Sequence, residues 1–232
     1  MRTQTLSIPG AERNDGSLSY YIANVTSYVL NPLCLPPISA AFWVAHFGAA
    51  RSTVWGMLGE SLLFFCILPL AYIVWMVRSG QTSSLEIRER TARTKPLWFG
   101  MACSLVGGFV MSATLPIHAS VIWSIVGTHM LVTLIMLIIT QWWKISLHLT
   151  GLSGFVTLLY FVTRQIWLLP TRDLITSDWV LPLFLTIPLL MWARVRVGAH
   201  TKGQVVAGAM LSFLLTYLFL HIVNVGIFDA AW

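Results

Sequence analysis

Three short polar segments interrupt an otherwise apolar chain, and each carries side chains that could do chemistry. The first segment, 87–96, places four basic residues within eight positions: Arg88, Arg90, Arg93 and Lys95. A guanidinium group can bind two phosphate oxygens at once through parallel hydrogen bonds, and an ammonium group adds a point charge. The segment therefore predicts a site for a polyanion, although a basic loop on the cytoplasmic side of a membrane has the same composition.

The second segment, 144–151, brings a base, a hydroxyl and an imidazole together as Lys144, Ser146 and His148. Histidine titrates near neutral pH, so His148 could give or take a proton at a membrane boundary. Considered alone, this segment is explained more simply by an interfacial histidine without a chemical task.

The third segment, 193–208, opens the last apolar run and contains Arg194, His200 and Gln204. His200 and Gln204 are four residues apart, so they share one face of a helix. A base and a histidine at a helix N-terminus predict a phosphate site, because the free N–H groups and the helix dipole both favour anions.

The elements that position these segments follow from composition. Of the 232 residues, 57% are hydrophobic and only 9% are charged, and the mean hydropathy is +0.78. Such a chain cannot cover a water-facing surface, which excludes a soluble globular protein and a disordered one. The apolar runs are continuous rather than alternating, which excludes a transmembrane β-barrel. The predicted fold class is all-α, a polytopic bundle of membrane helices.

Runs without formal charge predict about six to seven transmembrane helices in a single domain, 20–232, after a polar N-terminal segment, 1–19. Glu60 is expected in the first turn of the second helix, where an acid suits the helix dipole. The expected runs are a proline-kinked element in 16–50, then 61–77, two helices in 96–143 with a break at 115–118, 149–169, 179–193 and 203–228.

Seven crossings put the three polar segments and the N-terminus on one side of the membrane. Eleven of the 14 Lys and Arg residues then fall on that side, which favours a cytoplasmic location. The positive charge is thus explained by topology, and we expect no nucleic-acid partner. The expected location is a bacterial-type inner (plasma) membrane, with the three segments at its cytoplasmic face.

Taken together and in order, the three segments resemble the signatures of the type 2 phosphatidic acid phosphatase superfamily. The third signature, S-R-x5-H-x3-D, is similar to Arg194-x5-His200-x3-Gln204, and the second, P-S-G-H, is similar to 145–148. The first, K-x6-R-P, is similar to Arg88-x6-Lys95-Pro96, with each base exchanged for the other type. The resemblance covers about residues 80–225 and is closest to a variant branch with H-T-x-x-Q in the third motif.

The resemblance implies a metal- and cofactor-independent lipid phosphatase that cleaves a phosphomonoester or a diphosphate. His200 would attack phosphorus and form a phosphohistidine, with Gln204 as its orienting partner, and His148 would protonate the leaving alcohol. The implied phosphate-binding residues are Arg88, Lys95, Arg194 and Ser146. The expected partners are a lipid phosphate substrate and membrane lipids; which lipid phosphate is bound stays open.

Departures from the family pattern support a second hypothesis, a catalytically inactive relative that serves as an accessory subunit of a membrane complex. Gln204 stands where the family has Asp, so it accepts a hydrogen bond but supplies no charge to an imidazolium. Leu147 replaces a Gly, Ala193 replaces a Ser, and Lys95 lacks the two-pronged geometry of Arg.

A third hypothesis, haem or pigment binding, rests on four scattered histidines without paired spacing: His46, His118, His129 and His221. The three cysteines, Cys34, Cys66 and Cys103, lie in apolar runs and are expected to be buried thiols. Gly208-x3-Ser212 is a pattern of small residues that predicts close helix packing.

Overall fold

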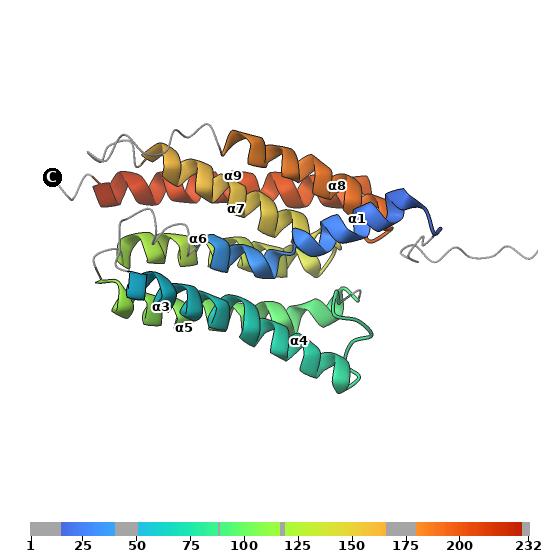
Figure 1. The fold of residues 1–232 in the computed structure, drawn as a ribbon, viewed down its shortest axis with the longest axis horizontal. Coiled ribbons are helices and arrows are strands. Elements are labelled where there is room, and N and C mark those ends of the chain that lie inside the picture. Colours follow the sequence, from blue (N-terminus) through green and yellow to red (C-terminus); the bar gives the residue numbers. More distant parts are fainter. Residues whose placement is uncertain (1–14, 40–50, 88, 117–118, 166–179, 229–232) are drawn as a thin grey trace, which may run out of the picture.

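The structure is a computed structural model that describes residues 15–39, 51–87, 89–116, 119–165 and 180–228. Within these ranges every regular element is a helix, so the predicted all-α class is confirmed. The helices lie side by side with their axes roughly along the long dimension of the molecule (Figure 1).

The N-terminal elements are α1 (Leu18–Val29), the short 3₁₀ turn η1 (Pro32–Cys34) and a long rod made of three helical pieces. The rod runs through α3 (Arg51–Leu62), the π-helical turn η2 (Leu63–Ile67) and α4 (Leu68–Arg78). Pro69, in the first turn of α4, has no N–H to give to the preceding turn, and the wider π turn accommodates this gap.

The remaining helices form an antiparallel pair, a parallel pair whose two helices start at the same end, and a shorter helix beside them. A 3₁₀ turn, η3 (Thr91–Arg93), leads into α5 (Thr94–Thr114), and α6 (Ala119–Thr140) returns beside it. Helix α7 (Leu147–Gln165) pairs with α9 (Lys202–Phe228), and η7 (Leu181–Leu185) with α8 (Thr186–Arg196) completes the group. The expected break at 115–118 is therefore confirmed by the end of α5 and the start of α6.

Among the described residues, four helices are long and apolar enough to cross a membrane: Ser52–Arg78, Thr91–Thr114, Ile122–Thr140 and Lys202–Val223. A shorter apolar helix covers Leu147–Phe161, and α1 and α8 have 12 and 11 residues. Large apolar side chains on the outer faces of α1, α5 and α9 are exposed, as expected for surfaces in contact with lipid. The chain is thus a membrane protein with four candidate spans in its described part, and the predicted count of six to seven stays a prediction.

Two expectations are wrong. The second helix begins about ten residues earlier than expected, so Glu60 lies well inside the Ser52–Arg78 span rather than in its first turn, where its Oε1 accepts a hydrogen bond from Thr114 at 2.6 Å. The charge-free run marked only residues 61–77 of this span, because the charge of Glu60 itself ended the run. Cys34 is exposed rather than buried.

Helices α7 and α9 approach closely because small and hydroxyl residues line both faces. A Cβ on Gly208 would lie 2.8 Å from the carbonyl oxygen of Ser146, and one on Gly154 would lie 2.7 Å from Oγ of Ser212. The Ser153 hydroxyl donates to the carbonyl of Ala209 at 2.8 Å. The predicted small-residue packing at Gly208 and Ser212 is therefore confirmed. It fixes α7, which carries His148, against α9, which begins just after His200 rather than including it as the sequence predicted.

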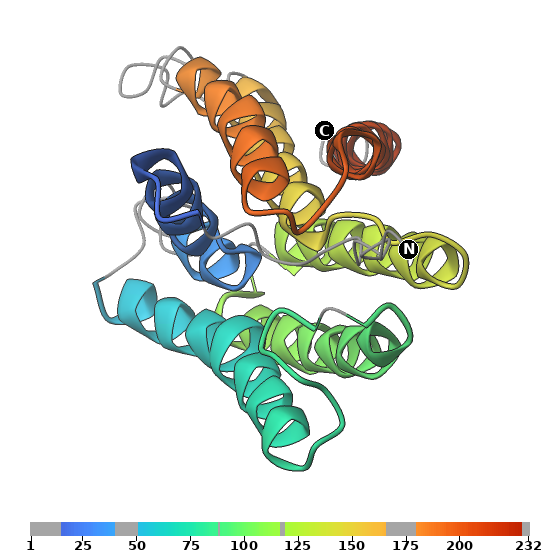
Figure 2. The same cartoon turned by 90° about the vertical axis from the view of Figure 1, so that its right-hand side faces the viewer.

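The connections that hold the three polar segments lie at the same end of the bundle. Figure 1 shows the α4–α5 connection, the α6–α7 turn and the α8–α9 turn together at the right-hand end, and Figure 2 looks onto that end. Alternating helix directions produce this arrangement.

Candidate functional site

Hydrogen bonds join the three segments to one another. The Nη1 of Arg93 donates to the carbonyl of Ile145 at 3.1 Å, and the backbone N–H of Ser146 donates to the carbonyl of Gln204 at 3.4 Å. Lys144 Nζ donates to the carbonyl of Ala199 at 3.3 Å. The expected meeting of the segments at one end of the bundle is therefore confirmed.

The end of α8 brings Arg194 and His200 together. Gly198 has φ of +75°, a left-handed conformation that a residue with a Cβ adopts only at a cost. The N–H groups of Ala199 and Gly198 then donate to the carbonyls of Arg194 and Val195, the two bonds of a Schellman motif. The N–H of His200 also donates to the Arg194 carbonyl, at 3.3 Å. The glycine before the histidine thus reverses the chain so that both functional side chains lie at the same end.

Thr201 and Gln204 form a capping box that begins α9 and also holds His200. The N–H of Gln204 donates to Oγ1 of Thr201 at 3.4 Å, and the N–H of Thr201 donates to Oε1 of Gln204 at 3.1 Å. Since a backbone N–H can only donate, the Gln204 atom that it meets must be the amide oxygen.

The same oxygen defines the tautomer of His200. Nδ1 of His200 lies 3.1 Å from Oε1 of Gln204, an acceptor, so a neutral His200 carries its proton on Nδ1. Nε2 then has a free lone pair. This is the tautomer that a nucleophilic histidine needs, and His200 is only 7% exposed.

The start of α7 positions His148. Ser146 is fully buried and caps the helix, since its Oγ accepts from the N–H of Leu149 at 3.5 Å. Leu147 packs into an apolar cluster with Met136 and Ile145, so it fills the space between α6, α7 and α9. His148, the next residue, is partly buried.

Arg93 is a site residue that the motif comparison missed. Its side chain is 4% exposed, and its Nε donates to the carbonyl of Ile87 at 2.9 Å. A signal was available in the sequence: Arg93 continues, at helical intervals, the buried stripe of α5 formed by Met101, Ser104 and Gly108. A base on the buried stripe of a membrane helix marks a functional position more strongly than a base elsewhere in the loop.

Arg194 is paired with a carboxylate that the sequence analysis did not single out. Both terminal nitrogens of Arg194 donate to Glu86, at 2.9 and 3.1 Å, in the two-pronged geometry that arginine also uses for phosphate. Arg194 is 3% exposed, and its buried Nε has no hydrogen-bond partner in the described part of the chain. One donor of this guanidinium is therefore left for another acceptor.

The two remaining predicted phosphate ligands have different outcomes. Lys95 is exposed, and its Nζ donates to Oε1 of Gln81 at 2.9 Å, so it braces the α4–α5 connection. Arg88 lies outside the described residues. Five of the seven predicted site residues gather at the start of α7 and the α8–α9 turn: Ser146, His148, Arg194, His200 and Gln204.

The electrostatics of the cluster favour neutral histidines and a bound anion. Burial, followed by the charges of Arg93 and Arg194, lowers the pKa of His200, whereas the hydrogen bond to Gln204 opposes that shift. Burial and Arg194 also lower the pKa of His148, and Glu86 acts in the opposite sense. The charge of Arg194 therefore acts on both imidazoles, as expected if the three groups flank one ligand.

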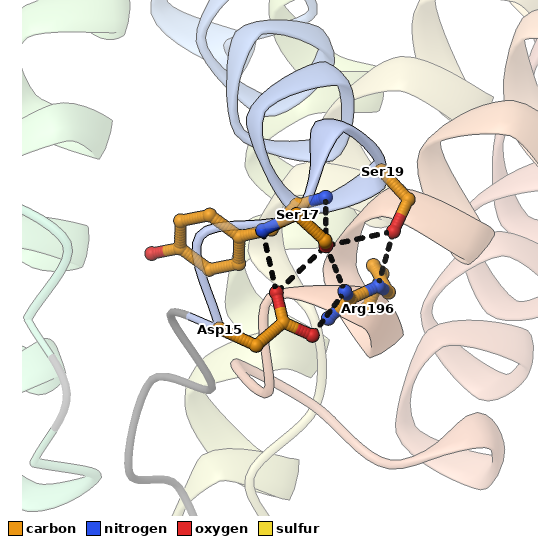
Figure 3. Close-up of polar contacts among 5 residues, drawn as sticks. Asp15, Ser17, Ser19 and Arg196 are labelled. Carbon is orange, nitrogen blue, oxygen red and sulfur yellow. Dashed lines mark hydrogen bonds and ion pairs between the residues drawn. The ribbon is translucent and has the colours of Figure 1, made fainter.

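Arg196, two residues after Arg194, serves a different purpose. Its Nη2 donates to Asp15 at 2.7 Å and to Ser17 at 2.6 Å, and its Nε donates to Ser19 at 3.0 Å (Figure 3). Hydrogen bonds from Ser17, followed by that from Arg196, lower the pKa of the Asp15 carboxyl to about 2. This exposed network fastens the start of α1 to the end of α8 and takes no part in the histidine cluster.

The chain was compared with models of protein families, with characterised proteins and with solved structures, and none of the three comparisons returned a match.

Proposed function

We propose that the protein is an integral-membrane lipid phosphatase that hydrolyses a phosphomonoester or a diphosphate of a lipid through a phosphohistidine. The substrate's phosphate would lie among His148, His200, Arg93 and Arg194 at the end of the bundle. The family resemblance of the three segments supports this function, and so does their meeting at one end of the bundle.

One observation carries the proposal. Gln204 accepts from Nδ1 of His200, so the lone pair of Nε2 is available for attack beside the buried guanidinium of Arg194. An interfacial histidine without a chemical task would have no need of a fixed tautomer next to buried positive charge.

The proposed reaction has two steps. Nε2 of His200 forms a bond to phosphorus, the bond from phosphorus to the lipid oxygen breaks, and that oxygen leaves with the electron pair and takes a proton from His148. Water then attacks phosphorus, gives a proton to His148, and the N–P bond breaks to release phosphate and free His200. Arg93 and Arg194 stabilise the charge that builds on the phosphoryl oxygens.

Substrate binding explains how His148 becomes a proton donor although its pKa is lowered in the unliganded site. The negative charges of a phosphate group offset those of Arg194 and Arg93, and therefore favour the protonated imidazole.

The test is phosphate release by the purified protein from phosphatidic acid, phosphatidylglycerol phosphate and a polyprenyl diphosphate. We expect release from at least one of them and its loss in His200→Ala, with the fold retained by size-exclusion chromatography. His221→Ala, which changes a histidine of α9 far along the helix, is the matched control and should keep the activity. Release that continues unchanged in His200→Ala would contradict the mechanism.

A second candidate function is the accessory subunit without catalysis. The pairing of Glu86 with both terminal nitrogens of Arg194 favours it, because a structural ion pair would account for both side chains. Under this hypothesis no lipid phosphate is hydrolysed by the parent protein, and His200→Ala still assembles with the same partners.

A further inference from the structure

We propose that Glu86 is an internal competitive ligand of the anion site, which an incoming phosphate group must displace from Arg194. This inference rests on the proposed function only in taking a phosphate as the displacing anion.

The geometry of the pair supports this role. The Glu86 carboxylate contacts Arg194 through both oxygens, at 2.9 and 3.1 Å, and so fills the positions that two phosphate oxygens would take. The guanidinium is buried, but the side chain of Glu86 is 33% exposed. The carboxylate therefore reaches Arg194 from the rim of the site and can turn into water without moving the helix that holds its partner.

The α4–α5 connection is braced so that it presents Glu86 in this position. Oε2 of Glu89 accepts from the hydroxyl of Thr82 at 3.1 Å, and Oε1 accepts from Ser83 at 3.0 Å. Ile87, next to Glu86, has φ of +43°, a strained conformation for a β-branched residue, and its carbonyl accepts from Arg93. Strain at this position persists only where the surroundings impose it, and here it directs Glu86 toward Arg194.

The charge of the cluster agrees with an exchangeable occupant. Arg93 and Arg194 are both buried, and the carboxylate of Glu86 is their nearest acidic counterpart among the interactions described. Buried guanidinium groups without an anion are costly, so the empty site would be unstable. Glu86 neutralises part of this charge while no anion is bound.

Competition has a distinctive signature in binding. Every ligand that displaces Glu86 gives up the same amount of binding free energy, whatever its own charge, because the same Glu86–Arg194 ion pair is broken. Removing Glu86 should therefore strengthen the binding of a dianion and of a monoanion by the same factor. A carboxylate that merely repelled anions from nearby would weaken a dianion more than a monoanion.

The experiment measures binding of methylphosphonate, a dianion at mildly alkaline pH, and of its O-methyl ester, a monoanion, by calorimetry on the full-length protein in detergent. We expect Glu86→Gln to bind both probes about tenfold or more tightly than the parent, because the charged hydrogen bonds that it removes are worth that much. Glu86→Asp keeps the negative charge, but the aspartate side chain is one methylene too short to make both contacts with Arg194. This variant should therefore bind both probes more tightly by a similar factor. Asp15→Asn removes the same charge from an exposed pair at the same end and should give none.

A gain limited to the dianion, or a gain in Glu86→Gln that is absent in Glu86→Asp, would show that Glu86 acts by charge alone and would overturn the proposal. Unchanged or weaker binding in both variants would overturn it too. Phosphatase activity is measured in parallel. If the protein releases phosphate but the variants show no gain in binding, the role of Glu86 is rejected and the proposed function is kept. If the variants bind more tightly but the protein releases no phosphate, the role of Glu86 is kept and the proposed function is rejected.

Discussion

Gln204 combines three tasks in one residue, and this explains how it can stand where the phosphatase signature has Asp. Its Oε1 accepts from Thr201 and from Nδ1 of His200, and its own N–H is capped by Thr201. The amide sets the tautomer of His200, but in the proposed mechanism it would bring no charge to stabilise a phosphohistidine.

Replacing Gln204 by Glu should therefore raise kcat/KM. Glutamate has the same reach, preserves the capping box and adds a negative charge beside Nδ1 of His200. The upper bound of the gain is about 10⁴-fold, the cost of the reverse change in a serine protease triad. Steady-state phosphate release checks the prediction, with Gln165→Glu at the end of α7 as a control; a slower enzyme would mean that charge at this position is not limiting.

The lowered pKa of His200 predicts a pH dependence of activity and of stability. Since the folded protein holds His200 neutral, the loss of kcat/KM on acidification should begin below pH 6.5, the ordinary pKa of histidine. An unfolded chain takes up that proton at higher pH than the folded one, so the stability contributed by neutral His200 is present above pH 6.5 and falls progressively below it. Thermal unfolding in detergent checks this, and the acidic loss of stability should shrink in His200→Gln. A profile that is the same in both proteins would contradict the assignment.

At the scale of helices, the histidine cluster depends on the close contact of α7 and α9. The spacing of Gly208 and Ser212 predicted such a contact, but the partner could not be predicted, because a small-residue face fits any similar face. Only the fold shows that Gly208 meets the carbonyl of Ser146, the residue that caps α7 before His148.

Gly208→Ala should destabilise the protein by about 1–3 kcal/mol and reduce activity, because its Cβ would lie 2.8 Å from a backbone oxygen that cannot swing away. Gly100→Ala is the matched control, since a Cβ there meets nothing within 4 Å and alanine favours a helix. The melting temperature in detergent and phosphate release measure both effects. Equal behaviour of the two variants would show that the α7–α9 contact does not support the site.

For the whole molecule, the sequence predicted what depends on local pattern and missed what depends on contacts distant in the chain. Continuous apolar runs identified a helical membrane protein, and the number of crossings between the polar segments predicted that they share one end. Glu86 was missed because no motif marks it, and its partner Arg194 is 108 residues away. Lys95 fitted the motif, yet the direction in which η3 enters α5 turns Arg93 inward instead.

The orientation of that end is a further prediction of the positive-inside rule. Leu85 is exposed in the α4–α5 connection, so Leu85→Cys should be protected from a membrane-impermeant thiol reagent in intact cells and should react once the membrane is permeabilised. Labelling of the parent protein measures the background from its own three cysteines. Strong labelling of Leu85→Cys in intact cells would place the histidine cluster on the outer face.

The central claim is that His200 is the nucleophile, and the most direct measurement is capture of the phosphoenzyme. Lipid phosphate carrying a radiolabelled terminal phosphoryl group is mixed with the protein and the reaction is stopped within the first turnover. We predict a covalent label that survives alkali, is released by acid, maps to the peptide containing His200 and is absent from His200→Ala, while His148→Ala retains or accumulates it. Turnover without any such label, or a label that persists in His200→Ala, would contradict the account.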